Sequence, residues 1–240
     1  MPEKKFKIFV DFDGTITKTD VGEALFMEFG DREKVEGIIQ NLLSDRISAR
    51  ESWVQLCGTV SDFSKERFDK FLENIEIDKS FVNFVEYCSS NKFEMYVLSD
   101  GFDYYINRIF KRENLDNLKV YSNRLQIDKM NQLIPSFPFF DAGCSSSANC
   151  KRNHIITHSS DEDYTIFIGD GNSDKYTVQF CDFIFAKDDL LKYCERERIS
   201  YFPFDNFQDV LKKIEQLRSK KRLKKRHQAV LKRREAYMIE

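Results

Sequence analysis

Residues 11–17 read Asp11-Phe12-Asp13-Gly14-Thr15-Ile16-Thr17 and follow directly on the apolar run Lys7–Val10. A short apolar run bounded by polar residues is typical of a buried β-strand. Two aspartates two positions apart could belong to a turn or to a Ca²⁺ loop. A Ca²⁺ loop of the helix–loop–helix type needs a longer series of oxygen ligands that ends in Glu, and the sequence lacks this series. Gly14 would let the backbone turn tightly, so that both carboxylates stand at a strand end.

Three further apolar runs have the same form, and the stretches between the runs show the pattern of amphipathic helices. These runs are Met95–Leu98, Thr165–Ile168 and Phe183–Ala186. Strands that alternate with helices predict an α/β fold, with a doubly wound, Rossmann-like parallel sheet that helices cover on both faces.

Polar clusters follow three of the four predicted strands. Besides residues 11–17, the clusters are Ser99–Gly101 and Gly169–Asp174. Open parallel sheets bind ligands beyond the carboxyl ends of their strands. The three clusters therefore predict one shared site.

The first two predicted strands are separated by far more chain than a crossover requires. A crossover between parallel strands needs about a dozen residues or more. The excess predicts a small helical cap at residues 18–79, inserted after the first strand. The α/β core then comprises residues 1–17 and 80–210, and residues 211–240 form a basic C-terminal helical extension. Residues 135–149, which contain two Pro, a Gly and three consecutive Ser, predict a loop.

Charge is unevenly distributed along the chain. Residues 211–240 carry twelve Lys or Arg and three Glu, a net +9, whereas the first 210 residues carry 26 basic and 37 acidic side chains, a net −11. Nucleic-acid affinity comes largely from phosphate neutralisation, so an acidic body predicts no nucleic-acid partner. The apolar run Ile8–Val10 is too short for a signal peptide or a membrane span. Together with six scattered cysteines, this favours a cytoplasmic protein with free thiols.

Residues 11–17 resemble the DxDGT motif of the haloacid-dehalogenase-like phosphatases, and the resemblance covers the chain up to about Leu217. It implies that Asp11 is a nucleophile that is transiently phosphorylated. A covalent acyl-phosphate divides one difficult hydrolysis into two easier steps. The resemblance also implies that Asp13 protonates the leaving alcohol and then deprotonates the attacking water.

Two further positions match the phosphate-binding residues of this family. Ser99 falls where the family has a Ser or Thr, and Lys151, 19 residues before Asp170, falls where it has a Lys. Alone, such a Ser is usually a turn residue and such a Lys a solvated charge, but phosphoryl transfer needs a cation to offset the developing negative charge. The candidates for phosphate or substrate binding are Gly14, Thr15, Ser99, Asp100, Gly101, Lys151 and Asp20.

Residues 169–174 read Gly-Asp-Gly-Asn-Ser-Asp and resemble the fourth motif of the family, GDGxxD. Such residues also favour plain turns, but four motifs in family order and at family spacing argue against coincidence. The resemblance implies that Mg²⁺ is held by Asp11, by the backbone carbonyl of Asp13 and by Asp170, which are the hard oxygen ligands that this ion prefers. Asp174 would lie behind these ligands and orient Lys151 or a metal-bound water.

The resemblance therefore implies a Mg²⁺-dependent hydrolase of a small metabolite phosphate. Residues 47–51 and 185–191 look like the methionine-salvage branch, which removes phosphate from 2-hydroxy-3-keto-5-methylthiopentenyl 1-phosphate. Phosphoethanolamine, phosphocholine and phosphoserine phosphatases are alternatives within the same class. A non-catalytic phosphate-ligand-binding protein and a phosphotransferase or mutase are alternatives of other classes. The filled catalytic positions argue against the non-catalytic protein.

Two positions depart from the pattern of the salvage and phosphoserine enzymes. Asp100 stands where these enzymes usually have a first Gly, and it resembles the phosphoethanolamine/phosphocholine branch, as does the segment Cys144–Lys151. An extra carboxylate there would favour a cationic headgroup. Leu56 stands where phosphoserine phosphatases have an Arg for the substrate carboxylate, which counts against phosphoserine. Asp20 is a second candidate for headgroup selection, although the N-cap of a cap helix is its commoner role.

Cys144, Cys150, His154 and His158 allow a zinc site to be considered, with the spacing C-x5-C-x3-H-x3-H. The two cysteines lie farther apart than the usual two to four positions. The histidine pair also fits one face of an ordinary amphipathic helix, which is the commoner reading.

The basic extension has no Gly or Pro between residues 218 and 234, so a helix is permitted. Its apolar residues form a thin stripe, and such a helix is marginal in isolation. A basic run can mark contact with nucleic acid or an anionic membrane. Because the body of the chain is acidic, we expect the extension to dock on its own core or on a neighbouring subunit and to be dispensable for chemistry.

Overall fold

The computed structural model describes residues 4–144 and 147–238 of the chain. The ends of the predicted core and extension, residues 1–3 and 239–240, and residues 145–146 of the core lie outside the described residues. The chain forms two compact units: the first comprises Met1–Ile16, Ile77–Leu98 and Lys151–Glu240, and the second comprises Thr17–Glu76 and Ser99–Cys150. The division into core, cap and extension that the sequence predicts stays a prediction.

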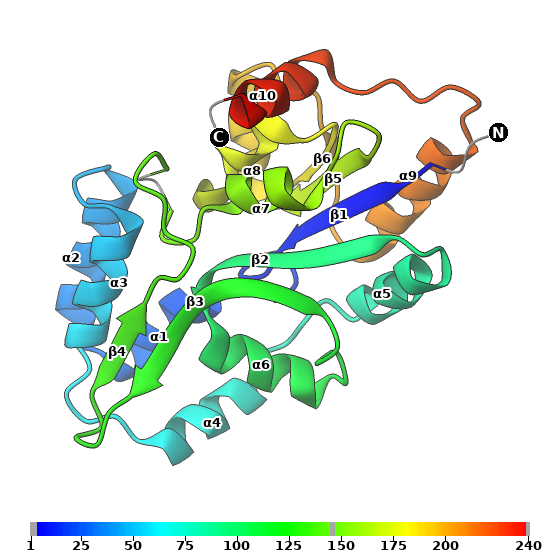
Figure 1. Cartoon of the computed structure of the whole chain (residues 1–240). Helices are drawn as coiled ribbons and strands as arrows, with labels where there is room; N and C mark the ends of the chain where they lie inside the picture. Colours follow the sequence, from blue (N-terminus) through cyan, green and yellow to red (C-terminus); the bar gives the residue numbers. More distant parts are fainter. Residues whose placement is uncertain (1–3, 145–146, 239–240) are drawn as a thin grey trace. The chain divides into compact units, whose positions relative to one another are not determined.

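The strands have the order β4-β3-β2-β1-β5-β6-β7. They are β1 (Phe6–Asp11), β2 (Glu94–Phe102), β3 (Lys119–Ile127), β4 (Leu133–Ser136), β5 (Tyr164–Gly169), β6 (Phe183–Ala186) and β7 (Phe202–Pro203). Strand β1 pairs in parallel with β2 and β5, and β5, β6 and β7 continue the parallel arrangement, whereas β3 and β4 are antiparallel (Figure 1). The four predicted strands correspond to β1, β2, β5 and β6, and the predicted α/β class is confirmed.

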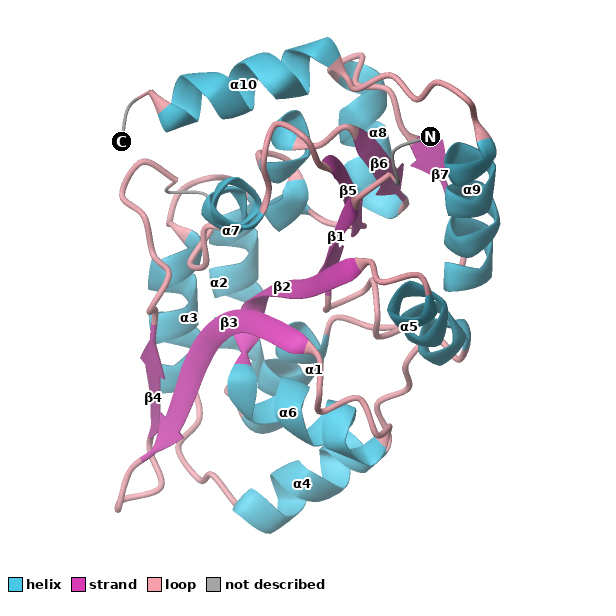
Figure 2. Ribbon diagram, turned by 45° about the vertical axis from the view of Figure 1, so that its right-hand side comes forward, coloured by secondary structure: helices cyan, strands magenta, loops and turns pink. Residues whose placement is uncertain are grey.

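Helices cover both faces of the strands in the first unit. Helices α5 (Ser80–Ser90) and α9 (Phe207–Ser219) pack through aromatic rings, with the centroids of Phe81 and Phe207 4.7 Å apart. Helices α7 (Lys151–His158) and α10 (His227–Tyr237) lie on the other side of these strands (Figures 1 and 2). The unit also contains α8 (Asp188–Arg196) and the 3₁₀ turns η1 (Asn172–Asp174) and η2 (Thr177–Phe180).

The second unit contains five helices among its described residues. They are α1 (Val21–Phe29), α2 (Arg32–Leu43), α3 (Ala49–Gly58), α4 (Lys65–Glu73) and α6 (Asp103–Arg112). Asp20, Asp31, Ser48 and Ser64 cap the first four by accepting a backbone N–H, which satisfies a donor that the helix itself leaves unpaired. Helices α4 and α6 lie together beside β3 (Figure 2), and the rings of Phe68 and Tyr104 stack at 5.0 Å. Helices α1 to α4 fall within residues 18–79.

The described part of the basic extension belongs to the first unit and contacts other residues of that unit. Residues 220–226 are not helical, and α10 begins only at His227. Arg233 of α10 is fully buried and forms an ion pair with Asp182 at 3.2 Å. Arg226 donates from Nε to the carbonyl of Cys181 at 3.0 Å.

All six cysteines are free and buried. No helix among residues 4–144 and 147–238 is long and apolar enough to cross a bilayer.

Candidate active site

The carboxyl ends of β1 and β5 bring two of the polar clusters together. Asp11 ends β1 and Gly169 ends β5. The two strands are parallel neighbours, with Val10 opposite Ile168. Asp11 and Asp170 therefore emerge at the same edge of the sheet.

Three carboxylates cluster at this edge. Asp11, Asp170 and Asp174 each place one oxygen within 4.8 Å of the oxygens of the other two. Asp174 is fully buried, and its Oδ2 accepts the backbone N–H groups of Asp170 and Gly171 at 3.2 Å each. The main chain of the turn therefore fixes the orientation of this carboxylate.

Lys151 lies against the cluster at the start of α7. Its side chain is fully buried, and Nζ donates to Asp11 Oδ1, to Asp174 Oδ1 at 2.7 Å and to Ser173 Oγ at 3.1 Å. A buried ammonium is stable only beside compensating negative charge. The two carboxylates supply that charge.

The electrostatics of the cluster follow from burial and from crowding of like charges. Burial, opposed by Lys151 and reinforced by Asp170, raises the pKa of Asp11 to about 7. Burial and Asp174 raise the pKa of Asp170 to about 6, and burial raises the pKa of Asp174 to about 6. For Lys151, burial lowers the pKa, but the attraction of Asp11 and Asp174 outweighs burial and raises it well above its usual range.

The turn after β1 shapes the rest of the site. Gly14 has φ +74°, and a Cβ atom at this position would lie 2.4 Å from Asp170 Oδ2, so a side chain is excluded on two grounds. The hydroxyl of Thr15 donates to Asp170 Oδ1 at 2.5 Å. Asp13 is half-buried in the same turn, which closes through the backbone bond from Ile16 N to Phe12 O at 2.9 Å.

The second unit holds the other predicted site residues. Ser99 is fully buried, directly after Leu98, the residue that pairs with Asp11. Its Oγ accepts the backbone N–H of Gly101 at 2.9 Å. Asp100 Oδ1 accepts the backbone N–H groups of Ala148 and Asn149 at 2.7 Å each.

Asp20 has the commoner of its two predicted roles. It is the N-cap of α1, and its Oδ1 accepts the backbone N–H of Glu23 at 2.8 Å. Arg50, the cap arginine nearest to Leu56 in the sequence, lies with its guanidinium 4.9 Å from the ring centre of Phe140.

Two residues quoted in the motifs were given no role by sequence reasoning. Ser173 contacts Lys151, and its position inside GDGxxD was the only available signal. Asn149 is fully buried, and its Nδ2 donates to the carbonyls of Ser99 and Tyr121 at 2.8 and 2.9 Å. Its signal in the sequence was its place in the segment Cys144–Lys151, two positions before the predicted lysine.

The sequence model of a protein family described as "Putative Phosphatase" matches residues 6–199, a segment that includes every residue of the cluster. The chain belongs to this family.

Curated relatives of this phosphatase cover nearly the whole chain. The 2-hydroxy-3-keto-5-methylthiopentenyl-1-phosphate phosphatase of Bacillus mycoides is 32% identical over 213 residues, which are 88% of this chain and 96% of that protein. Pdp3-interacting factor 1 of Schizosaccharomyces pombe is 29% identical over 223 residues, 90% of this chain and 97% of that protein. The chain is therefore a phosphatase, that is, a phosphomonoester hydrolase.

Solved structures share its fold. A substrate-bound complex of phosphoserine phosphatase superposes with a TM-score of 0.69 at 20% identity, covering 89% of this chain and 99% of that chain. A haloacid-dehalogenase family hydrolase from Salmonella enterica gives 0.68 at 18% identity, covering 88% and 71%. At these identities the likeness establishes the fold of the phosphatase and not its substrate.

The alternative zinc residues have packing roles. Among the described residues, the group of His, Cys, Asp and Glu side chains placed to hold a metal ion is the aspartate cluster. His158 stacks on Tyr96 with ring centres 4.6 Å apart, and His154 stacks on His158 at 6.4 Å. These contacts fit the amphipathic-helix reading.

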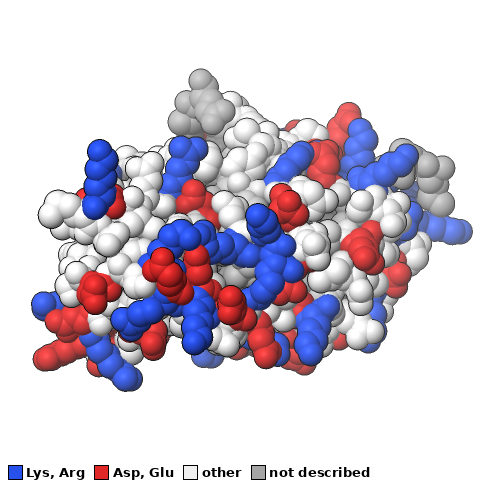
Figure 3. All heavy atoms as spheres, turned by 90° about the horizontal axis from the view of Figure 1, so that it is seen from below, with Lys and Arg blue, Asp and Glu red and all other residues white. Residues whose placement is uncertain are grey.

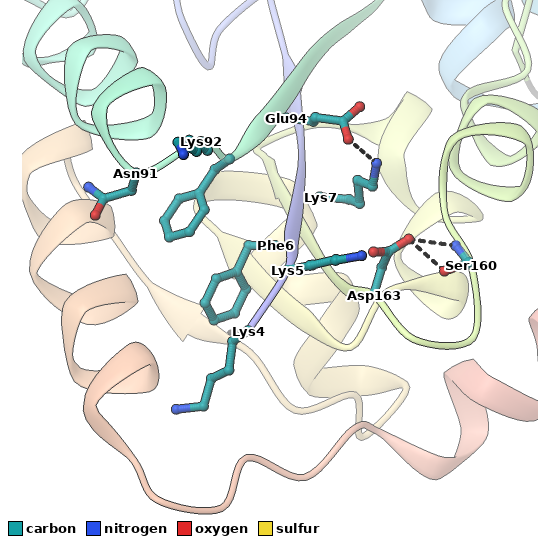
Figure 4. A pocket seen from close by; sticks show the side chains of 10 residues that line it. Lys4, Lys5, Phe6, Lys7, Asn91, Lys92, Glu94, Ser160 and Asp163 are labelled. Carbon is teal, nitrogen blue, oxygen red and sulfur yellow. Dashed lines mark hydrogen bonds and ion pairs between the residues drawn. The ribbon is translucent and has the colours of Figure 1, made fainter. Parts of the chain in front are cut away.

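A pocket of about 390 Å³ lies at the opposite end of β1 from Asp11 (Figure 4). Four lysines line it; of these, Lys7 pairs with Glu94, and Lys4 donates to the carbonyl of Leu217 at 3.4 Å. Asp163 in its wall accepts from Ser160 at 2.8 Å. None of the predicted site residues lines this pocket.

Proposed function

We propose that the chain hydrolyses a small phosphomonoester in a Mg²⁺-dependent reaction that passes through an aspartyl-phosphate on Asp11. The arrangement that carries the proposal is a buried carboxylate at a strand end, in contact with a buried lysine and with Asp170 and Asp174 within 4.8 Å. Covalent catalysis by a carboxylate needs such a nucleophile beside a fixed positive charge.

The residues of the cluster suit Mg²⁺. When all three carboxylates are ionised, one ammonium offsets only part of their charge, and a divalent cation would balance the rest. The donors are hard oxygens, which this ion prefers. Burial is the largest cause of the raised pKa of Asp11 and of Asp170, and a neighbouring carboxylate adds to it, so a bound cation would stabilise the ionised form of both groups.

Asp11, Asp170 and the backbone carbonyl of Asp13 would hold the ion. When bound, Mg²⁺ would draw negative charge from the phosphoryl oxygens and lower the pKa of the surrounding carboxylates.

The proposed reaction has two steps. In the first, an oxygen of Asp11 attacks phosphorus, the bond from phosphorus to the ester oxygen breaks, and Asp13 donates its proton to the leaving alcohol. In the second, Asp13 takes a proton from water, the water oxygen attacks phosphorus, and inorganic phosphate leaves with the Asp11 carboxylate restored. Lys151 offsets the charge of the phosphoryl group in both steps, and Ser99 is proposed as a second phosphate holder.

For the substrate, we propose 2-hydroxy-3-keto-5-methylthiopentenyl 1-phosphate first. Support comes from relatives named for this activity, at 32% and 30% identity over most of the chain. Phosphoethanolamine or phosphocholine is the second candidate, through the carboxylate at Asp100. Phosphoserine is the least supported, because Leu56 replaces the arginine that would bind its carboxylate.

A panel of monoesters tests the proposal. The panel should contain the salvage enolyl phosphate, phosphocholine, phosphoethanolamine, phosphoserine and p-nitrophenyl phosphate, each with Mg²⁺ and with excess chelator. We expect release of inorganic phosphate that requires Mg²⁺, and the highest kcat/KM identifies the substrate because specificity is a ratio of these constants.

The same panel separates the alternative classes. A mutase would move phosphate within or between substrates and release little of it. A binding protein would bind inorganic phosphate and release none from any ester, and this outcome would refute the hydrolase.

A further inference from the structure

Asp100 is tied to the segment that leads into Lys151. Its Oδ1 accepts two backbone N–H groups, from Ala148 and Asn149, at 2.7 Å each. Bonds of this length to a carboxylate are charge-assisted and about twice as strong as neutral ones. Two donors that converge on one oxygen also fix the direction of the peptide segment.

Asn149 completes the connection from the other side. Its side chain is fully buried, and Nδ2 donates to the carbonyls of Ser99 and Tyr121 at 2.8 and 2.9 Å. An amide nitrogen has two hydrogens, so both are used. Asn123 of β3 adds a bond from its own Nδ2 to the Asp100 carbonyl at 2.6 Å.

These bonds lie beside both proposed phosphate holders in the chain. Ser99 is one member of the network and follows Leu98, the partner of Asp11 in the sheet. Asn149 is another member and precedes Lys151 by two residues, with Cys150 between them held by its backbone bond to Phe139 at 3.0 Å. A shift of either segment would displace a phosphate holder.

We propose that Asp100 and Asn149 are positioning residues, which fix the main chain at Ser99 and in the segment that leads into Lys151, the two proposed phosphate holders. The inference rests on the proposed function, since it takes these two residues as the phosphate holders. It also gives Asp100 a different task from the selection of a cationic headgroup, because Oδ1 faces main-chain donors.

Inorganic phosphate separates the two tasks, because it has no headgroup. If Asp100 selects a cationic headgroup, then Asp100→Ala should leave phosphate inhibition unchanged or strengthen it, since a negative charge is removed. If Asp100 positions the phosphate holders, the inhibition constant for phosphate should rise by about 10-fold or more, the scale expected for misplaced binding groups.

The experiment compares Asp100→Ala, Asp100→Asn and Asn149→Ala with the parent chain. We expect kcat/KM to fall by a similar factor on phosphocholine and on p-nitrophenyl phosphate, and Asp100→Asn, which keeps an oxygen acceptor, to be the mildest variant. Asp103→Asn is the matched control: its Oδ1 also accepts a backbone N–H, from Leu125 at 3.0 Å and not from residues 148–149. The control should leave phosphate inhibition within about two-fold of the parent, a surface-scale effect.

Amide hydrogen exchange supplies a readout that does not depend on activity. The amides of Ala148 and Asn149 should exchange faster in Asp100→Ala than in the parent chain, because they lose their acceptor. Unchanged exchange, or a loss of kcat/KM confined to cationic esters with unchanged phosphate inhibition, would overturn the positioning role. If the parent chain hydrolyses no ester, the proposed function fails, and direct phosphate titration together with exchange still decides the role of the network.

Discussion

At the residue scale, the chemistry of the cluster depends on how few cations oppose its carboxylates. Lys151 is buried between Asp11 and Asp174, whereas Asp170 accepts a hydrogen bond from the hydroxyl of Thr15 and is stabilised electrostatically by Lys187 and Lys151. The protein therefore leaves charge for a divalent cation to neutralise. Removal of a single hydrogen-bond donor to these carboxylates should mainly change the affinity of the cluster for a cation.

Thr15→Val tests this balance. The substitution keeps the shape of the side chain but removes the bond to Asp170 Oδ1, which helps to lower the pKa of Asp170. We expect the Mg²⁺ concentration for half-maximal activity to rise by about 10-fold, the usual scale for a group that supports a metal ligand. Thr15→Ser keeps the hydroxyl and should remain near the parent value. Equal Mg²⁺ requirements in Val and Ser variants would contradict this role.

The residues of the cluster could be predicted because their motifs are local. Asp11, Asp13 and Asp170 follow strand ends, and parallel strands bring such ends to one edge. The partners of Asp100 could not be predicted, because they are backbone groups 48 and 49 positions away in the sequence. No periodicity or spacing reports such a contact.

At the scale of elements, apolar runs in the sequence predicted the buried strands β1, β2, β5 and β6. They did not predict β3 and β4, which contain more polar residues. Strand β3 reads Lys-Val-Tyr-Ser-Asn-Arg-Leu-Gln-Ile, and the last two residues of β4, Pro135 and Ser136, fall in the stretch 135–149 that was expected to be a loop. Both strands are stabilised by pairing with each other, which a reading of single segments does not register. Helix α10 has too thin an apolar stripe to be stable by its own sequence. Its buried Arg233, which pairs with Asp182, adds a contact with the rest of the first unit that stabilises it.

Arg233 should therefore be important for stability. Its Nη1 donates to Thr165 Oγ1 at 3.0 Å and its Nη2 pairs with Asp182, all in the interior. Arg233→Met would leave the Asp182 carboxylate buried without its cation, and we expect the free energy of unfolding to fall by about 3–5 kcal/mol. Arg234→Met is the control, because Arg234 pairs with Asp161 at the surface and its loss should cost less than about 1 kcal/mol. Similar losses in urea unfolding of both variants would contradict the assignment.

His154 of α7 should make stability depend on pH. Burial, and secondarily His158, lowers its pKa to about 4. Its pKa in the unfolded chain is about 6.5. Below that value the unfolded chain takes up a proton that the folded chain refuses, so stability is present above pH 6.5 and is lost as the pH falls towards 4.

The contribution of His154 to the pH dependence is its part of the difference between the free energies of unfolding at two pH values. At pH 5 the loss should be about 2 kcal/mol relative to pH 8. His154→Phe removes this part of the pH dependence, and urea unfolding of both proteins at the two pH values isolates it. The same pH dependence in variant and parent would show that His154 does not titrate between these limits.

At the scale of the whole molecule, the basic extension and the acidic remainder of the chain partly neutralise each other, because arginines of the extension pair with aspartates elsewhere in the chain. The extension carries a net +9 and the rest of the chain −11, and the extension contacts the first unit through Arg226, Arg233 and Arg234. On the face drawn in Figure 3, basic and acidic side chains are intermixed. This face offers no extended surface of one sign.

Deletion of residues 218–240 should separate stability from chemistry. The truncated chain loses Arg233, so it should unfold at lower urea concentration than the parent. Because none of the proposed catalytic residues lies in the deleted segment, kcat on a small ester should stay within a few-fold under conditions where the chain is folded. A collapse of kcat in folded, truncated protein would show that the extension helps to build the site. Salt-sensitive binding of the full chain to DNA or anionic vesicles, lost on truncation, would favour a partner instead.

The central claim is that Asp11 carries the phosphoryl group. The most direct measurement is acid quenching during turnover of a ³²P-labelled ester with Mg²⁺, followed by tandem mass spectrometry of the peptide that contains Asp11. We predict label on Asp11 in the parent chain and no label in Asp11→Asn, whose turnover should fall by several orders of magnitude because no nucleophile remains. Label on another residue, or near-native turnover of Asp11→Asn, would contradict the account.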